Sequence, residues 1–523
     1  MEVAISINSF DINFLSYMQE NAELRFNDAV NVFPEKSIVG LKRSQSRINY
    51  YLPDNKNIVC AGDAFHCKIN YKEYSDFINA ITLNKYLSSE NERITLILFY
   101  CFLYGTVNTS KLYKDIGVSL STKKKDIKVL VDYLCQFELH VEIINRKGVR
   151  IRGNELAFRI LIMKIIASIC ELNQLNQFMP RIANNPYERL MYQGLSRDEV
   201  VQAVLYRDSF NEILNRYQLD LSYPGKKFLL IYLMILEKRL SVDNMQLSLP
   251  GMKIELPLQP VFVNPVENVF VNHFINSLDH NYYKLIYIDI MLYRATTQFV
   301  QSVQEKMITG ISHHRELYDE IYIYIQKCII RKTYLYDVPD VNLPKARKHY
   351  PGLFSYVEDA IIRTEEFYTV QFDKNQIATL CLILKKFIMN SKMVGRNRKS
   401  IAIVTTSSIE KVKFFVANLR CYVDVGDCFN INFNEIYKLE DLEHFLTIVF
   451  SNRISLLLQD KGIPHLKINY YLQPKDIDKL ITAGLSSNIN RKINADEFSN
   501  AIRHVPPDVL VLYLKEKYGD HFA

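Results

Sequence analysis

A helical repeat of apolar residues dominates this sequence and limits the folds that it can form. Between Asn154 and about Met389, apolar side chains recur every three or four residues, in segments such as FRILIMKIIASI, FLLIYLMILEKRL and IATLCLILKKFI. That spacing buries one face of an α-helix. Turn signals interrupt it at NNP (184–186), YPG (223–225) and LPG (249–251). We therefore expect one or two helical bundles in this half of the chain.

The rest of the chain shows other patterns, and its 523 residues are enough for about three to five domains. Residues 1–90 and 91–153 each combine short helical patterns with short strands. After the polar run at 390–400, buried strands such as IAIVTT alternate with helical patterns, which is typical of a small parallel α/β domain. The sequence therefore predicts a mainly α-helical, multidomain protein.

Composition and cysteine usage favour a cytoplasmic protein. The chain is 48% hydrophobic and 23% charged, as globular proteins are. Its nine scattered cysteines lack the short-loop pairing of a disulfide framework. The first residues do not have the pattern of a signal peptide, and the longest apolar runs fall short of the roughly 18 residues of a membrane-spanning helix. We expect no membrane association.

Residues 109–134 have the pattern of a helix-turn-helix. In TSKLYKDIG, Leu112 and Ile116 lie on one face of a short helix, and Gly117 permits a tight turn. Ser119 is placed to cap the second helix. The predicted buried stripe of that second helix consists of Ile127, Leu130, Val131 and Leu134.

The second helix carries cations where a helix normally avoids them. Its predicted outer face consists of Ser121, Lys124, Lys125 and Lys128, with Lys123 at the edge. Cations near a helix N-terminus cost about 0.3–1 kcal/mol each, because the backbone dipole is already positive there. A recognition helix enters the major groove with its N-terminus first, so contacts with DNA phosphates would offset that cost.

The hairpin HVEIINRKGVRIRG supports DNA binding, because it predicts the wing of a winged helix. Arg146 and Lys147 fall at its tip, and Arg150 lies on the return strand. Residues 91–153 contain eleven Lys and Arg against six Asp and Glu, a surplus of five in a chain whose net charge is +7. The alternative is a solvated basic face without a partner.

Residues 1–90 offer a weaker copy of the same arrangement. Phe26–Phe33 and Ser37–Leu52 are the two candidate helices, and Lys42, Arg43 and Arg47 are predicted to point outward from the second. We expect this segment to be a second DNA-reading unit.

LYKDIGVSLSTKKKDIKVLVDYL, followed by KGVRIRGNELAFR, closely resembles the helix-turn-helix and wing of bacterial regulators that carry PRDs, the phosphotransferase-system regulation domains. ISHHRELYDEIYIYIQKCIIR and KHYPGLFSYVEDA resemble the core of a second PRD. IAIVTTSSIEK, LTIVFSN and IPHLKINYYL resemble a IIB-like domain of sugar phosphotransferase systems. The segment order is most similar to that of the Mga/AtxA-type virulence regulators of Gram-positive bacteria.

The resemblance implies a domain organisation and a function. The expected domains are a winged-helix-like domain (1–90), a winged helix-turn-helix (91–154), PRD1 (155–304), PRD2 (305–392), a IIB-like α/β domain (398–490) and a tail (491–523). Such a protein binds double-stranded promoter DNA, activates virulence or sugar-responsive genes, and forms a homodimer through the IIB-like domain. Phosphocarrier proteins of the phosphotransferase system would be further partners.

The regulatory histidines of PRDs are only partly present. Tyr232 and Ile383 stand where the family carries histidines, and His273 and His280 are substitutes in PRD1 that no motif supports.

In PRD2, His313 and His314 remain as the predicted phosphorylation sites, although a solvated pair at a helix start is the alternative. Residues 405–407 (Thr-Thr-Ser) replace the phosphocysteine of the IIB family, which makes phosphoryl transfer by this domain doubtful.

The sequence has no motif of an enzyme, a metal site or a cofactor site. It lacks a nucleophile elbow, a phosphate-binding glycine loop and HExxH. Cys60, His66 and Cys67 lie close together, but their spacing is not that of a structural zinc site, and we expect free thiols. The rival functions are an RNA-binding antiterminator with PRDs and a phosphocarrier protein.

Overall fold

The computed structural model describes residues 6–518 except 204, 240–246, 255, 257–261, 263, 283–287, 308–313, 337–345, 391–398, 488–497, 500–501 and 504. The chain divides into two units. The first unit consists of residues 1–212, 227–248 and 451–460, and the second of residues 213–226, 249–450 and 461–523. Among the described residues, no helix has the length and apolar character needed to cross a membrane.

The first unit opens with a small helical domain that contains a three-stranded sheet. Its elements are β1 (Ile7–Asn8), α1 (Ser9–Asn21), β2 (Glu23–Arg25), α2 (Phe26–Val32), α3 (Ile38–Asn49), β3 (Val59–Ala61), β4 (Ala64–His66), α4 (Tyr71–Ala80) and β5 (Tyr86–Leu87). The antiparallel sheet has the order β2-β4-β3. Phe14 and Phe65 are fully buried, with ring centroids 5.4 Å apart, and join α1 to the sheet. Both helices predicted at 26–33 and 37–52 are confirmed.

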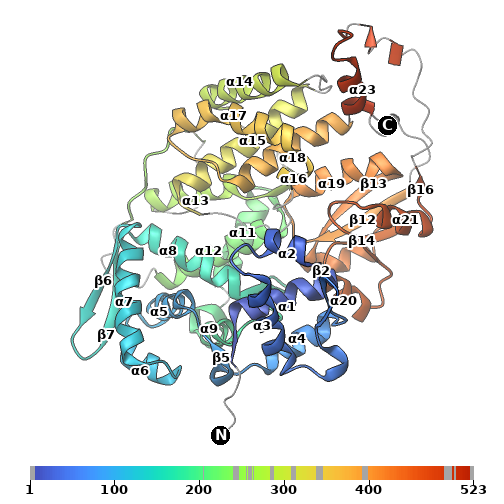
Figure 1. The fold of residues 1–523 in the computed structure, drawn as a ribbon. Helices are drawn as coiled ribbons and strands as arrows, with labels where there is room; N and C mark the ends of the chain where they lie inside the picture. Colours follow the sequence, from blue (N-terminus) through green and yellow to red (C-terminus); the bar gives the residue numbers. More distant parts are fainter. Residues whose placement is uncertain are drawn as a thin grey trace. The chain divides into compact units, whose positions relative to one another are not determined.

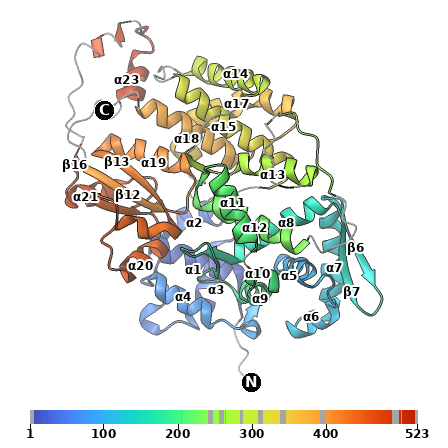
Figure 2. The ribbon, with the colours of Figure 1, turned by 180° about the vertical axis from the view of Figure 1, so that it is seen from behind.

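The same order of helices and hairpin follows in the next segment. It contains α5 (Glu90–Tyr104), α6 (Thr109–Asp115), α7 (Leu120–Cys135), β6 (Leu139–Ile144) and β7 (Gly148–Gly153). β6 and β7 pair in antiparallel register, and the hairpin projects beyond α7 in both views (Figure 1 and Figure 2). Gly148 has φ +119°, and a Cβ there would lie 1.9 Å from the carbonyl oxygen of Val107. Only glycine lets β7 approach Val107, with which Val149 forms a bridge.

The predicted helical region after residue 154 is confirmed. Its first elements are α8 (Glu155–Ile169), α9 (Pro186–Ser196), α10 (Glu199–Gln202), α11 (Leu205–Arg216) and α12 (Tyr223–Arg239). A small hairpin of β8 (Cys170–Leu172) and β9 (Phe178–Pro180) lies between α8 and α9. The helical periodicity did not predict this hairpin. The short helix α20 (Asn452–Asp460) also belongs to the first unit.

The helical bundle of the second unit is built mainly from α14, α15, α17 and α18 (Figure 1). Its helices are α13 (Pro265–Ser277), α14 (Ile290–Lys306), α15 (His314–Thr333), α16 (Ala346–His349), α17 (Pro351–Tyr368) and α18 (Lys374–Asn390). Strands β10 (Asp220–Leu221) and β11 (His280–Tyr282) pair beside it.

A mostly parallel sheet and its helices complete the second unit. These elements are β12 (Lys399–Thr405), α19 (Ile409–Tyr422), β13 (Val423–Asn432), η3 (Phe433–Leu439), β14 (Leu446–Val449), β15 (Leu466–Lys467), α21 (Pro474–Thr482) and β16 (Ser486–Ser487). The strand order is β15-β14-β12-β13-β16. All pairs are parallel except β13–β16. Strand β13 ends at Asn432, where a 3-10 helix begins.

The bundle and the sheet share one hydrophobic core. Buried residues of α15 and α18 form a single cluster with those of β12 and α19. The helix α23 (Leu510–Tyr518) lies in the segment expected to be a tail.

Candidate nucleic-acid interface

The turn between α6 and α7 has the geometry that the sequence predicted. Gly117 adopts φ +70°, a left-handed conformation that glycine accepts without strain. The Val118 N–H donates to the carbonyl oxygen of Tyr113 at 2.9 Å. The Ser119 hydroxyl caps α7 by accepting the Thr122 N–H at 3.1 Å. These local bonds fix the angle at which α7 leaves the turn.

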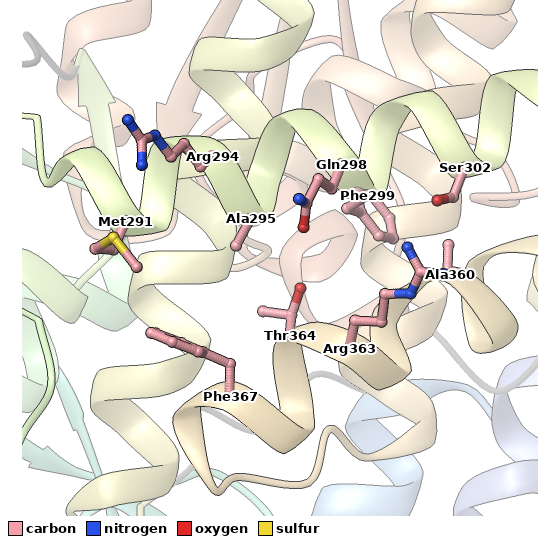
Figure 3. Close-up of a pocket in the computed structure, with 10 residues that line it drawn as sticks. All are labelled: Met291, Arg294, Ala295, Gln298, Phe299, Ser302, Ala360, Arg363, Thr364 and Phe367. Carbon is pink, nitrogen blue, oxygen red and sulfur yellow. The ribbon is translucent and has the colours of Figure 1, made fainter.

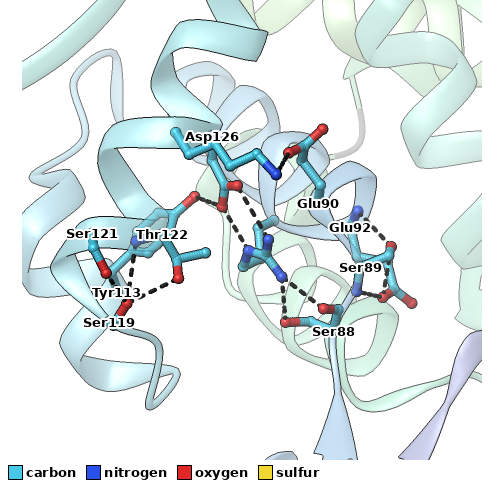
Figure 4. Close-up of polar contacts among 11 residues, drawn as sticks. Ser88, Ser89, Glu90, Glu92, Tyr113, Ser119, Ser121, Thr122 and Asp126 are labelled. Atoms are coloured by element: carbon cyan, nitrogen blue, oxygen red, sulfur yellow. Dashed lines mark hydrogen bonds and ion pairs between the residues drawn. The ribbon is translucent and has the colours of Figure 1, made fainter.

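A buried charged cluster ties the three helices of this domain together (Figure 4). Asp126 of α7 is fully buried, and its carboxylate accepts two bonds from Arg93 of α5, at 2.6 and 3.1 Å. The Tyr113 hydroxyl of α6 donates to the same carboxylate at 2.6 Å. Arg93 also donates to the carbonyl oxygen of Ser88 at 2.6 Å. We refer to Arg93, Tyr113 and Asp126 as the Asp126 cluster.

The contacts within the Asp126 cluster raise the pKa values of both its arginine and its tyrosine. The hydrogen bond to Asp126 raises the pKa of Arg93 despite its partial burial. Burial, with the bond to Asp126, raises the pKa of Tyr113 well above its usual range. The tyrosine therefore stays a donor and the arginine stays a cation, as the buried carboxylate requires.

The sequence did not predict this cluster. Arg93 was only counted among the basic residues of 91–153, and Asp126 was assigned to no face. The available signal was spacing, because Asp126 precedes the buried Leu130 and Leu134 by four and eight residues on one helical face. The prediction that Val131 is buried was wrong, since it is 37% exposed.

The predicted contact residues of α7 lie on its solvent face. Ser121, Lys124, Lys125 and Lys128 are all exposed. Lys125 is 76% exposed, and its Nζ lies 3.9 Å from a carboxylate oxygen of Glu90. Such an exposed pair is weak. Lys123 is half-buried and donates to the Ser110 hydroxyl at 3.0 Å, which agrees with its predicted place at the edge.

Within the described part of the chain, the wing presents two cations without an ion pair and two paired ones. Arg146 and Lys147 are exposed at the hairpin turn, where Arg146 adopts φ +63°. Arg150 and Arg152 both donate to Glu142 on the facing strand, at 3.0 and 3.2 Å. These bonds, that of Arg150 first, lower the pKa of the Glu142 carboxyl. The charge of Arg150 is therefore partly compensated within the hairpin.

In the N-terminal domain, Lys42 and Arg43 are exposed as predicted, but the outward placement of Arg47 was wrong. Its guanidinium binds the fully buried carboxylate of Asp11 with bonds of 2.6 and 2.9 Å. This pair joins α1 to α3. It corresponds to the pair that joins α5 to α7, with the positions of acid and base exchanged.

Family comparisons agree with these arrangements. Residues 80–165 match the model of the Mga helix-turn-helix domain, and residues 297–387 match the model of the PRD domain. The chain matches a Mga-type, PRD-containing regulator. A search of curated proteins found no match. The first match contains α5, α6, α7 and the β6–β7 hairpin, so the prediction of a helix-turn-helix similar to that of Mga-type regulators is confirmed for this segment.

The two predicted phosphorylation sites fall within the residues of the PRD match. His314 is the first residue of α15, and its side chain lies outside the described residues, as does all of His313. Tyr232 and Ile383, which are predicted to stand in place of PRD histidines, are fully buried.

The two alternative histidines, His273 and His280, are buried. Nδ1 of His273 lies 2.7 Å from the Tyr334 hydroxyl, and Nε2 of His280 lies 3.1 Å from the carbonyl oxygen of Ile275. Burial lowers the pKa of each imidazole to about 4. Both rings are therefore largely shielded from solvent.

Acidification is expected to destabilise the second unit through these two histidines. Their folded pKa of about 4 lies below the 6.5 of an unfolded histidine. Between those pH values the unfolded chain binds protons that the folded unit excludes. The stability that the two neutral histidines contribute is therefore complete above pH 6.5 and is lost as the pH falls toward 4. At about 1.4 kcal/mol per pKa unit, the pH-dependent contribution of each histidine to the free energy of unfolding is roughly 3 kcal/mol.

Urea unfolding at pH 7 and pH 5 measures this effect. His273→Gln removes one titrating ring, so its loss of stability between the two pH values should be smaller than that of wild type. An equal loss in both proteins would contradict the assignment.

Proposed function

We propose that this chain is a transcriptional regulator that binds promoter DNA through α7 and the β6–β7 hairpin. The observation that carries the proposal is the exposed row of Lys124, Lys125 and Lys128 on a helix whose opposite face is held by the Asp126 cluster. The row starts in the second turn of α7, directly after Lys123, so positive charge is concentrated near the N-terminal end of the helix. Phosphate contacts and counterion release would make this charge favourable on DNA.

The contacts available on α7 favour phosphates over base edges. Lysines on the exposed face act as point charges, whereas base reading relies mostly on Arg, Asn and Gln. Ser121 is the one predicted contact on this face without a charge. The wing would add Arg146 and Lys147, with Arg150 free to exchange Glu142 for a phosphate. We infer a domain that senses DNA shape as well as sequence.

The N-terminal domain would be a second winged helix. Its elements α1, α2, α3 and the β3–β4 hairpin follow the order of α5, α6, α7 and the β6–β7 hairpin, and each set has one buried ion pair between its first and third helices. Lys42 and Arg43 of α3 are its candidate DNA contacts.

The regulatory part of the proposal rests on resemblance. Two PRDs, at 155–304 and 305–392, would sense phosphotransferase flux through phosphorylation of His314 or His313 by phosphocarrier proteins. The α/β domain at 398–490 would act as a IIB-like module for homodimerisation. Activation of virulence or sugar-responsive genes in the cytoplasm is the role that such regulators imply.

A phosphocarrier function has less support. Thr405 and Ser407 occupy the end of β12, where a IIB domain would need a thiol, and both are buried. The Ser407 N–H donates to the Thr405 hydroxyl at 3.1 Å. A buried hydroxyl that accepts such a bond, as that of Thr405 does, is a poor substitute for a phosphate-accepting thiolate.

Gel-shift titration of the full chain with duplex DNA and with hairpin RNA tests the proposal against an antiterminator. We expect duplex DNA to bind more tightly at equal salt, whereas preferential binding of the RNA hairpin would contradict a DNA regulator. Incubation with labelled phosphoenolpyruvate and the general phosphotransferase proteins tests the regulatory part. Label on His313 or His314 supports it, and an unlabelled chain contradicts it.

A further inference from the structure

A cavity of about 340 Å³ lies between α14 and α17 of the second unit (Figure 3). Both helices contribute polar and apolar side chains to it. This volume is within the range of small-molecule sites. None of its lining residues belongs to α7, to the β6–β7 hairpin or to α15, so nothing in the proposed function accounts for it.

The cavity is lined by two arginines and by no carboxylate. Arg363 extends from α17 toward α14, whereas Arg294 points away from α17 (Figure 3). Neither arginine forms an ion pair with a carboxylate among the described residues. The same two helices do pair Lys306 with Asp359, at 2.7 Å. Arg363 therefore lies on the same pair of helices as the Lys306–Asp359 ion pair but takes no part in an ion pair among the described residues.

Further polar groups face the same space. Gln298 of α14 and Thr364 of α17 point toward one another across the cavity (Figure 3). Thr364 is only 3% exposed, so its hydroxyl is held in place by its surroundings. An arginine beside an amide and a hydroxyl is a donor set suited to carboxylate or phosphate oxygens.

The remaining wall is apolar. Phe299 is almost fully buried at the base, while Met291 and Phe367 are 48% and 45% exposed at one end of the cavity. In Figure 3, Met291 projects toward Phe367. When a ligand covers exposed apolar side chains at the mouth of a cavity, the removal of their surface from water favours binding.

We propose that this cavity binds a small anion that also carries an apolar ring or chain. Arg363 holds the anionic group, Gln298 and Thr364 orient it, and Met291 and Phe367 cover the apolar part. The site gives the PRD an input by reversible binding, in addition to any phosphorylation of α15.

Calorimetric titration of the full chain with phenyl phosphate tests this proposal, with inorganic phosphate and phenol as partial probes. Phenyl phosphate should bind more tightly than either probe. Arg363→Gln should weaken it about tenfold or more, since bonds to charged groups are strong. Phe367→Ala should weaken phenyl phosphate but leave inorganic phosphate unchanged. Arg197→Gln, the same change at an exposed arginine of the first unit, should have no effect.

Three outcomes would overturn the proposal. Phenyl phosphate does not bind, it binds Arg363→Gln as tightly as wild type, or phenol binds as tightly as phenyl phosphate. Circular dichroism of Arg363→Gln guards against a folding defect, which we do not expect because the side chain is exposed.

Discussion

Replacing Asp126 by alanine is expected to lower the free energy of unfolding of the first unit by about 3–5 kcal/mol. The substitution leaves the Arg93 guanidinium buried between α5 and α7 without its carboxylate, and it leaves the Tyr113 hydroxyl without its acceptor. Breaking a buried pair by removing one partner is costly, because the other charge remains desolvated. Urea unfolding of the full chain, followed by a probe in the first unit, measures the loss.

Two controls isolate the Asp126 cluster. Asp132→Ala removes an exposed carboxylate from the same helix and should change stability by less than about 0.5 kcal/mol. The double variant Arg93→Met/Asp126→Leu removes both charges and should be more stable than Asp126→Ala alone. If Asp126→Ala behaves like Asp132→Ala, the buried pair does not hold the domain together.

Replacing Lys327 by methionine is expected to destabilise the second unit by a similar amount, about 3–5 kcal/mol. Lys327 of α15 is 2% exposed and donates to Asp279 at 3.2 Å and to Glu410 of α19 at 3.1 Å. Arg331 also pairs with Asp279, at 3.0 Å. Glu410 has no other ion pair among the described residues, and its second carboxylate oxygen already lacks a hydrogen bond. Methionine would leave that carboxylate buried and unpaired.

The electrostatics of this site support the same conclusion. Burial alone would raise the pKa of Asp279, but Lys327 and Arg331 together hold it well below its usual range. Burial also opposes the charge of Lys327, yet Glu410 and Asp279 raise its pKa. The buried cations and the buried carboxylates of this site therefore each favour the charged form of the other.

The helical bundle and the sheet should unfold together in Lys327→Met, because they share one core. Lys413→Met, at an exposed lysine of α19, is the matched control. Adding Glu410→Gln to Lys327→Met should recover part of the lost stability. Separate unfolding steps for bundle and sheet, with only one of them shifted, would contradict a single coupled unit.

Local signals allowed the helix-turn-helix to be predicted from the sequence. The turn at Gly117, the cap at Ser119 and the apolar spacing of α6 and α7 each depend on residues that are close together in the sequence. Their patterns can therefore be recognised from the sequence alone. The hairpin around Arg146 is equally local. The alternation of strands and helices after residue 399 predicted a parallel sheet for the same reason.

The ion pairs were not predictable in this way. Arg93 and Asp126 are 33 residues apart, and Arg47 and Asp11 are 36 apart. The sequence shows charged residues, which are usually exposed, and only the packing of one helix on another shows which of them are buried. The same limit explains the error at Val131 and the unexpected burial of His273.

The most direct test of the account is the salt dependence of duplex DNA binding by wild type and by Lys124→Ala/Lys125→Ala. The control is Lys461→Ala/Lys475→Ala, which removes two exposed lysines from the second unit. Each lost phosphate contact should make the slope of log K against log salt shallower by about 0.9. We predict weaker binding and a slope shallower by about 1–2 for the α7 variant alone. Identical slopes for all three proteins, or no binding by wild type, would contradict DNA recognition by α7.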